Sequence, residues 1–437
     1  MNEEKKTDKK PLIGFFPLFY NLAETGRAIL VAKRYMEQRG KVVFFSHGGE
    51  YEKLAKEDGF KIVRINPIYT KEFIDDLWKY SRLEKKGAPF SYEVLKEHVE
   101  NEIKAFKKTD VKLIITTNNF PCSISARAAN IPLISITPYV ANKFSYFPDD
   151  ANILISNLIP NSIKLPILNY FFPRAKTWSR PFTKLSKTYK NAPNFKNPSD
   201  INKGDYNFFT DFLELLNLQE SEIRPNDFFI GPIFLDELFQ KNNSKKELDK
   251  EILSHLKKPG KSILITFGSS GTKEFYLKIL DSLNKTNYNV IAVYSSILSE
   301  KDLPNLKGNI LLRKFVPTIK DLHQKADLAI MHGGQGTIYT AAYAGKPVIG
   351  IPMQFEQHQN LEMLIKNGSA ISESRKYFSE KKLIKSIKTI FDNYDLFLEK
   401  AQILAEKIPE PNGDQNAMKI ILEILEKRGL IKCDKGR

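Results

Sequence analysis

The sequence has very little cysteine and no long apolar run, and both features narrow the class of protein. Only two of its 437 residues are cysteine, Cys122 and Cys433, which excludes a disulfide framework and a cysteine-based zinc site. No stretch reaches the roughly 20 consecutive apolar residues that a membrane-spanning helix needs. The N-terminus is polar and charged and lacks the apolar centre of a signal peptide. We therefore expect a cytoplasmic globular protein.

Several motifs of common protein classes are also missing. The chain has no Walker A, G-x-G-x-x-G or G-x-S-x-G sequence, which argues against P-loop enzymes, typical dinucleotide enzymes and serine hydrolases. Nothing resembles a zinc finger, an RNP motif or a helix-turn-helix, so we expect no nucleic-acid partner. The net charge of +16 leaves two explanations open: a Lys-rich composition without functional meaning, or a peripheral contact with the anionic inner face of a membrane.

Short β-branched runs alternate with segments of helical period along most of the chain. Segments 28–39 and 92–107, for example, have the spacing of amphipathic helices. Alternation of strands and helices predicts doubly wound α/β domains with parallel sheets. The expected strands are 11–16, 41–46, 61–65, 112–117 and 132–136 in a first series, and 262–267, 289–294, 309–312, 327–331 and 347–351 in a second.

The two series of strands imply two tandem Rossmann-like domains. We predict an N-terminal domain over 11–239 and a C-terminal domain over 251–408, with a charged linker at 240–250. Residues 141–207 are rich in Pro, Asn and aromatic residues without a sustained period. We therefore expect an irregular insertion over the first sheet in that stretch.

The most informative segment is the His-Gly-Gly-Gln-Gly-Thr run from His332 to Thr337, between the predicted strand 327–331 and a predicted helix. Ligands of open parallel sheets bind beyond the carboxyl ends of the strands. Glycines allow the backbone to approach a ligand closely, and a helix N-terminus offers free N–H groups and a positive dipole end. The run predicts a diphosphate site that needs no metal, with His332 as a further donor. A tightly packed turn without a ligand is the alternative.

Neighbouring segments extend this candidate site. Glu356 and Gln357 follow the next strand, and a carboxylate beside an amide suits recognition of adjacent sugar hydroxyls. A second strand-to-glycine turn lies at 268–271, and Phe315 with Val316 follows a third strand, where it can meet a base. The candidate donor-binding residues are Gly268, Ser269, Ser270, Phe315, Val316, His332, Gly333, Gly334, Gly336, Thr337, Glu356 and Gln357.

With these elements in order, the span 315–370 resembles the donor-binding signature of the UDP-glycosyltransferase superfamily, the inverting, family 1-like group with the GT-B fold. The resemblance implies two α/β domains around a central cleft and transfer of a hexose from a nucleotide sugar to an acceptor hydroxyl. By this likeness His332 and the backbone of Gly336 and Thr337 hold the diphosphate, and Glu356 and Gln357 hold the sugar. It also implies no cofactor beyond the co-substrate. The C-terminal segment 409–437, with an amphipathic helix at 414–427, would cross back to the first domain.

The chain also lacks the D-x-D motif of metal-dependent GT-A enzymes, in keeping with that likeness. Two departures from the family pattern stand out. Relatives carry a ribose-binding Glu where this chain has Thr340, so UDP is the expected nucleotide but the resemblance does not fix it.

The second departure concerns the catalytic base. Relatives use a His after the first strand, oriented by an Asp; here Glu24 aligns with the His, and Asn118 or Asn119 with the Asp. We take Glu24 as the candidate general base, with an N-terminal helix residue favoured by the dipole as the structural alternative. His47, past the second strand, is the other candidate base.

The acceptor is the least readable part of the function. Segment 169–190 interleaves aromatic and basic residues, which is typical of an interfacial surface and would suit a lipid acceptor. A cap that packs on the first domain is the competing interpretation, and a small-molecule acceptor fits it equally. Two other functions stay open at this point, a non-catalytic GT-B-fold partner protein and a nucleotide-sugar epimerase.

Overall fold

The computed structural model describes most of the chain, with gaps that are largest between residues 140 and 177. The described residues are 10–81, 84–85, 87–139, 163, 166–167, 170, 178–196, 198–216, 221, 223–239, 248–268, 271–295 and 297–431. The predicted N-terminal tail, most of the predicted linker and much of the segment 141–177 lie outside them.

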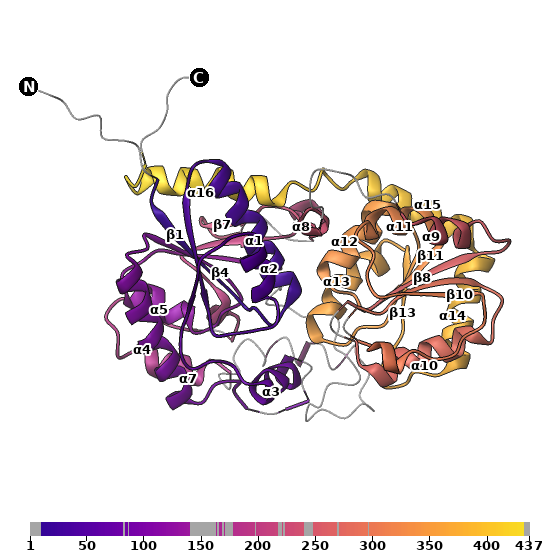
Figure 1. Cartoon of the computed structure of the whole chain (residues 1–437), viewed down its shortest axis with the longest axis horizontal. Helices are drawn as coiled ribbons and strands as arrows, with labels where there is room; N and C mark the ends of the chain where they lie inside the picture. Colours follow the sequence, from indigo (N-terminus) through magenta and orange to yellow (C-terminus); the bar gives the residue numbers. More distant parts are fainter. Residues whose placement is uncertain are drawn as a thin grey trace, which may run out of the picture.

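The first half of the chain folds around a seven-stranded parallel sheet of order β3-β2-β1-β4-β5-β6-β7 (Figure 1). The central strands are buried along almost their whole length, which explains why they are continuously apolar. The strands are β1 (Leu12–Pro17), β2 (Lys41–Ser46), β3 (Ile62–Arg64), β4 (Leu113–Thr117), β5 (Leu133–Thr137), β6 (Tyr206–Phe209) and β7 (Asp227–Phe229).

Helices cover both faces of this sheet because successive side chains of a strand point to opposite faces. Phe15 of β1 belongs to a core shared with α1 (Leu22–Glu37) and α16 (Gly413–Lys427). Its neighbour Phe16 belongs to the opposite core, with α4 (Tyr92–Thr109) and α5 (Cys122–Ala128). Smaller helices complete this half: α2 (Glu52–Glu57), α3 (Lys71–Ser81), α7 (Arg180–Ser186) and α8 (Asp236–Phe239).

The second half repeats the plan with a six-stranded parallel sheet of order β10-β9-β8-β11-β12-β13. Its strands are β8 (Ser262–Thr266), β9 (Asn289–Val293), β10 (Ile310–Arg313), β11 (Leu328–Met331), β12 (Val348–Gly350) and β13 (Ala370–Ser372). Its helices are α9 (Lys250–Leu256), α10 (Lys273–Asn284), α11 (Ile319–Lys325), α12 (Gln335–Ala344), α13 (Phe355–Lys366), α14 (Glu380–Asp392) and α15 (Tyr394–Glu406).

The last helix returns to the first half of the chain. In Figure 1, α16 runs along the N-terminal half, and its apolar residues Ala417, Met418 and Ile421 enter the core around α1. An ion pair of 2.5 Å between Arg34 Nε and Asp414 Oδ2 fixes the start of α16 against α1. The chain therefore crosses between its two halves twice.

The predicted fold class is confirmed: two Rossmann-like α/β units with parallel sheets. Three strands, β6, β7 and β13, were not among the predicted ones. The expectation of irregular structure up to residue 207 is wrong at its end, because β6 begins at Tyr206 and pairs in parallel with β5 and β7. Its Tyr-Asn-Phe-Phe sequence lacks β-branched residues, and its buried Asn207 donates to Asp227 Oδ1 at 2.8 Å. β13 has only three residues, too few for a readable period.

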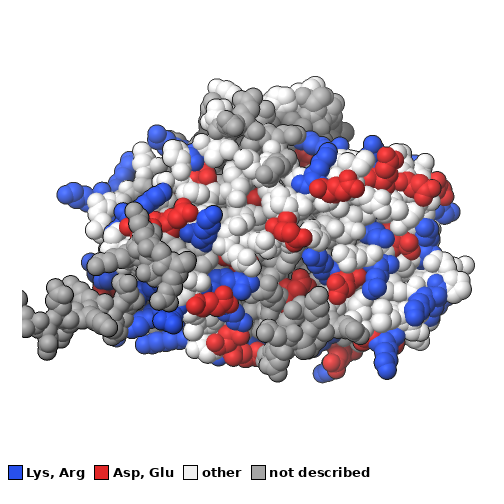
Figure 2. Space-filling view, turned by 90° about the horizontal axis from the view of Figure 1, so that it is seen from above, with Lys and Arg blue, Asp and Glu red and all other residues white. Residues whose placement is uncertain are grey.

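The distribution of charged side chains on the surface does not show why the chain has such a high net charge. On the face seen in Figure 2, Lys and Arg are interspersed with Asp and Glu rather than gathered in one patch. Among the helices that the structure describes, none has the length and the apolar character that crossing a membrane requires.

Candidate functional site

Segments that follow strands of the two sheets touch one another between the two halves of the molecule. Thr210, directly after β6, donates through Oγ1 to Oε1 of Gln335, the first residue of α12, over 2.8 Å. Gln335 follows the glycine turn after β11. The candidate donor site is therefore in direct contact with the carboxyl-terminal edge of the first sheet.

The glycine turn after β11 tolerates no side chain. Gly333 has a φ of 86°, and a Cβ there would lie 2.8 Å from the carbonyl oxygen of Gln357. A Cβ on Gly334 would lie 2.3 Å from Nε2 of His332. Both glycines are thus required by close packing between the turn, the His332 ring and α13.

His332 is a buried, neutral imidazole. Its exposed fraction is 6% and its ring packs against Phe267, with 6.2 Å between ring centroids. Burial lowers its pKa to about 4, although a backbone hydrogen bond to Thr266 opposes this shift. Its Nδ1 has no partner among the described residues. A buried ring nitrogen without a partner is costly to maintain and is the kind of atom that a bound ligand satisfies.

The N-terminus of α12 is also open for a ligand. Its N-cap residue, Gly334, makes no side-chain cap and the first turn has no acidic residue. A Cβ added to Gly336 would meet no heavy atom within 4 Å. The first N–H groups of this ten-residue helix therefore lack side-chain partners and suit an anion such as a diphosphate.

Glu356 and Gln357 lie at the start of α13, beside the glycine turn. Gln357 Oε1 accepts hydrogen bonds from the backbone N–H of Met353 at 2.7 Å and of Gln354 at 3.2 Å. Asn360 Nδ2 joins the two segments, donating to Glu356 Oε1 at 3.3 Å and to the carbonyl of Gly333 at 3.2 Å. Gln357 therefore shapes the turn before α13, while Glu356 is a half-buried residue beside it.

Burial raises the pKa of Glu356, and charges from the first half of the chain act on it as well. Arg27 lowers this pKa, whereas Glu24 and Asp211 raise it.

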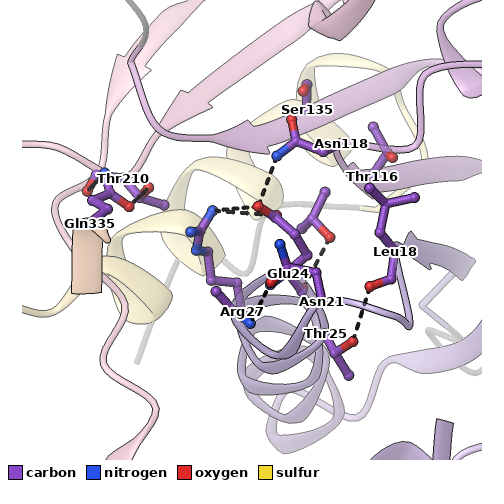
Figure 3. Close-up of polar contacts among 12 residues, drawn as sticks. Leu18, Asn21, Glu24, Thr25, Arg27, Thr116, Asn118, Ser135, Thr210 and Gln335 are labelled. Carbon is purple, nitrogen blue, oxygen red and sulfur yellow. Dashed lines mark hydrogen bonds and ion pairs between the residues drawn. The ribbon is translucent and has the colours of Figure 1, made fainter. Parts of the chain in front are cut away.

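Glu24 is buried in the first turns of α1, with an exposed fraction of 4%. Its Oε1 accepts a hydrogen bond of 2.8 Å from Nδ2 of Asn118, and Arg27 Nη1 lies 3.4 Å from its Oε2. Asn118 follows β4 in a left-handed conformation with a φ of 61°. In Figure 3 the guanidinium of Arg27 lies on the side of Glu24 that faces Gln335. Two donors thus hold the carboxylate at the edge of the first sheet.

His47 occupies a different environment, inside the first half of the chain. Its Nε2 contacts Glu102 Oε1 at 2.9 Å, and its Nδ1 faces the carbonyls of Ile65 and Pro67, both at 3.0 Å. Glu102, which is fully buried, also accepts from Asn119 Nδ2 at 3.2 Å. Both ring nitrogens of His47 are therefore engaged by protein atoms. The two aligned asparagines separate: Asn118 serves Glu24, and Asn119 serves Glu102.

The remaining predicted donor residues lie in two other segments, one after β8 and one after β10. Ser269 and Ser270 lie outside the described residues. Gly268 packs against the His332 ring, and its Cβ would lie 3.1 Å from Cε1. Val316 is buried, whereas Phe315 is 45% exposed and packs against Phe239 of α8, with 4.7 Å between ring centroids.

Three residues of this interface were missed by sequence reasoning. Arg27, Asp211 and Gln335 are all buried, with exposed fractions of 5% to 6%. Gln335 stands inside the glycine motif, and Asp211 follows the unpredicted strand β6. A polar residue directly after a buried strand was the available signal for Asp211.

The aromatic and basic segment 169–190 is described only in part. Residues 169 and 171–177 lie outside the described ranges, while Phe182 and Leu185 are fully buried in a core with α4. Lys184 Nζ lies 4.4 Å from the ring centroid of Tyr92. Phe182 and Leu185 therefore pack inward on the first half of the chain, as the alternative interpretation expected, whereas Tyr170 is 57% exposed.

No group of three or more His, Cys, Asp and Glu side chains suited to a metal ion occurs within the ranges that the structure describes. The predicted absence of a metal stays a prediction.

Comparisons of sequence point to sugar-transferring enzymes. Residues 262–412, the second half of the molecule, match the model of the glycosyltransferase family 28 C-terminal domain. UDP-glucuronosyltransferase 2B23 of Macaca fascicularis is 23% identical over 364 residues, which are 75% of this chain and 62% of that protein. A PGL/p-HBAD biosynthesis glycosyltransferase of Mycobacterium tuberculosis is 23% identical over 328 residues, 72% of this chain and 71% of that one. The chain thus spans about 62% of the length of the first relative.

Solved structures agree on the fold. The glycotransferase of kitacinnamycin superposes with a TM-score of 0.64 over 95% of this chain and 99% of its own, at 14% sequence identity. The predicted GT-B fold is therefore confirmed. The likeness to glycosyltransferases is supported at that general level, and the narrower family 1 assignment stays a prediction.

Proposed function

We propose that this protein is a glycosyltransferase that moves a hexose from a nucleoside diphosphate sugar to an acceptor hydroxyl with inversion at the anomeric carbon. The observation that carries the proposal is the contact between the two halves of the site. Thr210 and Asp211, at the edge of the first sheet, form hydrogen bonds with Gln335 beside the glycine turn of the second, and the buried carboxylate of Glu24 lies at the same edge of the first sheet. A donor held at that turn is then close to a group that can take a proton from the acceptor.

The donor site is proposed from three features of the second domain. The uncapped N-terminus of α12 offers N–H groups to the diphosphate, and the unpartnered Nδ1 of His332 offers one more polar contact. These groups stabilise charge on the leaving nucleotide without calling on a metal. Glu356 faces the sugar in this proposal. UDP is the proposed nucleotide, on the basis of the sequence resemblance and of relatives named as UDP-glucuronosyltransferases.

Glu24 is the proposed general base, and Asn118 its orienting partner. Inverting transfer needs a group that removes the proton of the acceptor hydroxyl as the anomeric carbon is attacked. The 2.8 Å hydrogen bond from Asn118 and the nearby Arg27 keep the Glu24 carboxylate in one orientation. We assign His47 a structural role, since its two ring nitrogens both have protein partners.

The acceptor is proposed only as an alcohol, on a small molecule or a lipid. We do not extend the proposal to a membrane contact, because Phe182 and Leu185 of the aromatic segment are buried. An acceptor search therefore starts with both classes, presented in detergent where needed.

The test measures nucleotide release from UDP-, dTDP- and GDP-hexoses with a panel of acceptors. We expect one nucleotide to be released with an acceptor, and the Glu24→Gln variant to transfer about 10²- to 10⁴-fold more slowly. The glutamine keeps the acceptor oxygen for Asn118 but loses the ion pair with Arg27, so the unfolding temperature should fall while UDP affinity stays that of the wild type. Glu37→Gln, an exposed substitution on the same helix, is the matched control.

The outcomes separate the two parts of the proposal. A wild type that binds no nucleotide and releases none refutes the transferase assignment. An active wild type with an equally active Glu24→Gln variant refutes only the base assignment.

A further inference from the structure

A short segment of the first domain holds the first turn of α12 through a connected set of hydrogen bonds. Asp211 Oδ1 accepts from Gln335 Nε2 at 2.8 Å and from the Tyr339 hydroxyl at 3.0 Å. The backbone N–H of Phe212 donates to the same hydroxyl at 3.3 Å. Gln335 Nε2 also donates to the carbonyl of Thr210 at 2.9 Å. Figure 3 shows the Thr210–Gln335 contact beside Glu24 and Arg27.

Asp211 also forms a hydrogen bond within its own domain. Its Oδ2 accepts a hydrogen bond of 2.6 Å from the backbone N–H of Tyr139, just after β5. The carboxylate is 5% exposed, so both of its oxygens are used for contacts within the protein. Burial raises the pKa of Asp211. The hydrogen bonds that it accepts and the charge of Arg27 lower this pKa, but by less than burial raises it. A group retained at such a cost is more than a space-filling residue.

The place of this contact in the site is what gives it meaning. Gln335 and Tyr339 belong to the helix whose N-terminus is the proposed diphosphate site, and Gly336 lies between them. Glu24 belongs to the domain that carries Asp211. The contact therefore fixes the distance between the donor and the base, which lie on different domains.

We propose that Asp211 is a positioning residue that aligns the phosphate-binding end of α12 with Glu24 across the two domains. The inference rests on the proposed function. Donor binding uses groups of the second domain alone and should not depend on Asp211. Transfer needs both domains in register and should depend on it strongly, since a displacement of about 1 Å can cost 10²-fold in rate.

The experiment compares Asp211→Ala, Tyr339→Phe and the double variant with the wild type. We expect Asp211→Ala to lower kcat for transfer by about 10- to 100-fold while UDP affinity by calorimetry changes less than about twofold. Tyr339→Phe should cost less, because it removes one of the three donors to Asp211. On the Asp211→Ala background, Tyr339→Phe should cost less than in the wild type, since the acceptor of the hydroxyl is already gone and only the hydrogen bond from the Phe212 N–H is still lost.

A control and an independent readout distinguish positioning from general damage. Asp414→Asn changes another buried carboxylate, which lies at the start of α16 and pairs with Arg34 of α1. This variant should lower the unfolding temperature without changing kcat. Small-angle scattering should show a larger radius of gyration for Asp211→Ala than for the wild type. Equal kcat values in an active wild type and Asp211→Ala, or equal losses of kcat and UDP affinity, would overturn the inference. A wild type without transfer activity would instead refute the proposed function.

Discussion

Replacing Gly336 by alanine separates the donor-binding role of α12 from its structural role. The glycine is the second residue of the helix and does not have a positive φ. A Cβ at this position would meet no heavy atom within 4 Å. Alanine favours helix over glycine by about 0.5–1 kcal/mol, so the variant should unfold at the same temperature or slightly higher.

Donor binding should respond in the opposite direction. If the diphosphate rests on the first N–H groups of α12, the new methyl group lies between the helix and a phosphate oxygen. Loss of one hydrogen bond to a charged group costs about 1.5–3 kcal/mol. That corresponds to roughly 10- to 100-fold weaker UDP binding. Titration calorimetry with UDP and thermal unfolding of the same samples measure the two effects.

The neighbouring substitution shows why Gly336 is the sharper choice. A Cβ on Gly334 would lie 2.3 Å from His332 Nε2, so Gly334→Ala must displace the imidazole or the helix. We expect it to lose stability and binding together, which would not distinguish the two roles. A Gly336→Ala protein that is stable and binds UDP as tightly as the wild type would refute the assignment of the diphosphate to this helix.

Three further predictions concern charge. Asn118→Asp places a carboxylate about where an amide now donates to Glu24 at 2.8 Å; repulsion should raise the pKa of the pair and move the pH optimum of transfer upward. Treatment with EDTA should leave the transfer rate unchanged, because the proposed function assigns the contacts with the diphosphate to α12 and His332 rather than to a metal. Burial lowers the pKa of four histidines to about 3 or 4: His98, His323, His332 and His358. Since these pKa values lie below the unfolded value of about 6.5, their contribution to stability is complete above that pH and is lost as pH falls toward 4, by up to about 3 kcal/mol each. The unfolding free energy between pH 7.5 and 4.5 should show this loss. His323→Leu should reduce the slope of the unfolding free energy against pH by about one proton, since both ring nitrogens of His323 are buried and have no partner among the described residues. An unchanged slope would contradict the assignment.

Most of the fold was predictable because most of its strands can be recognised from their own residues. β2 was expected over the same residues that it occupies, since a buried parallel strand is a continuous apolar run bounded by polar residues. β6 escaped because its aromatic and amide residues are also typical of irregular segments, and its strand character depends on the neighbours β5 and β7. Local pattern fails where a strand owes its conformation to pairing.

The candidate site divides in the same way. The glycine turn from His332 to Gly336 is contiguous in sequence, so its shape could be expected from residue types alone. Asp211 and Gln335 are 124 positions apart, and nothing in the sequence of either segment indicates that the two side chains meet. The partner of His47, Glu102, is 55 positions away, and without it the histidine looked free to act as a base. Sequence reasoning named the groups that we propose to meet a ligand, but it could not show which of them already have partners within the protein.

The geometry around Glu24 also bears on the choice between an enzyme and a degenerate partner protein. In the family that the sequence resembles, a His base donates a hydrogen bond to an Asp. Here both positions differ, yet Asn118 Nδ2 donates to Glu24 Oε1 over 2.8 Å. The hydrogen bond is kept with its direction reversed, because a carboxylate base needs a donor as its partner whereas a histidine base needs an acceptor. Independent loss of two catalytic residues would not be expected to leave a matched pair. If Glu24 is the base that we propose, the changes at Glu24 and Asn118 are better explained as one coupled change than as decay. The transfer rate of Asn118→Ala measures the coupling: it should fall, although by less than in Glu24→Gln.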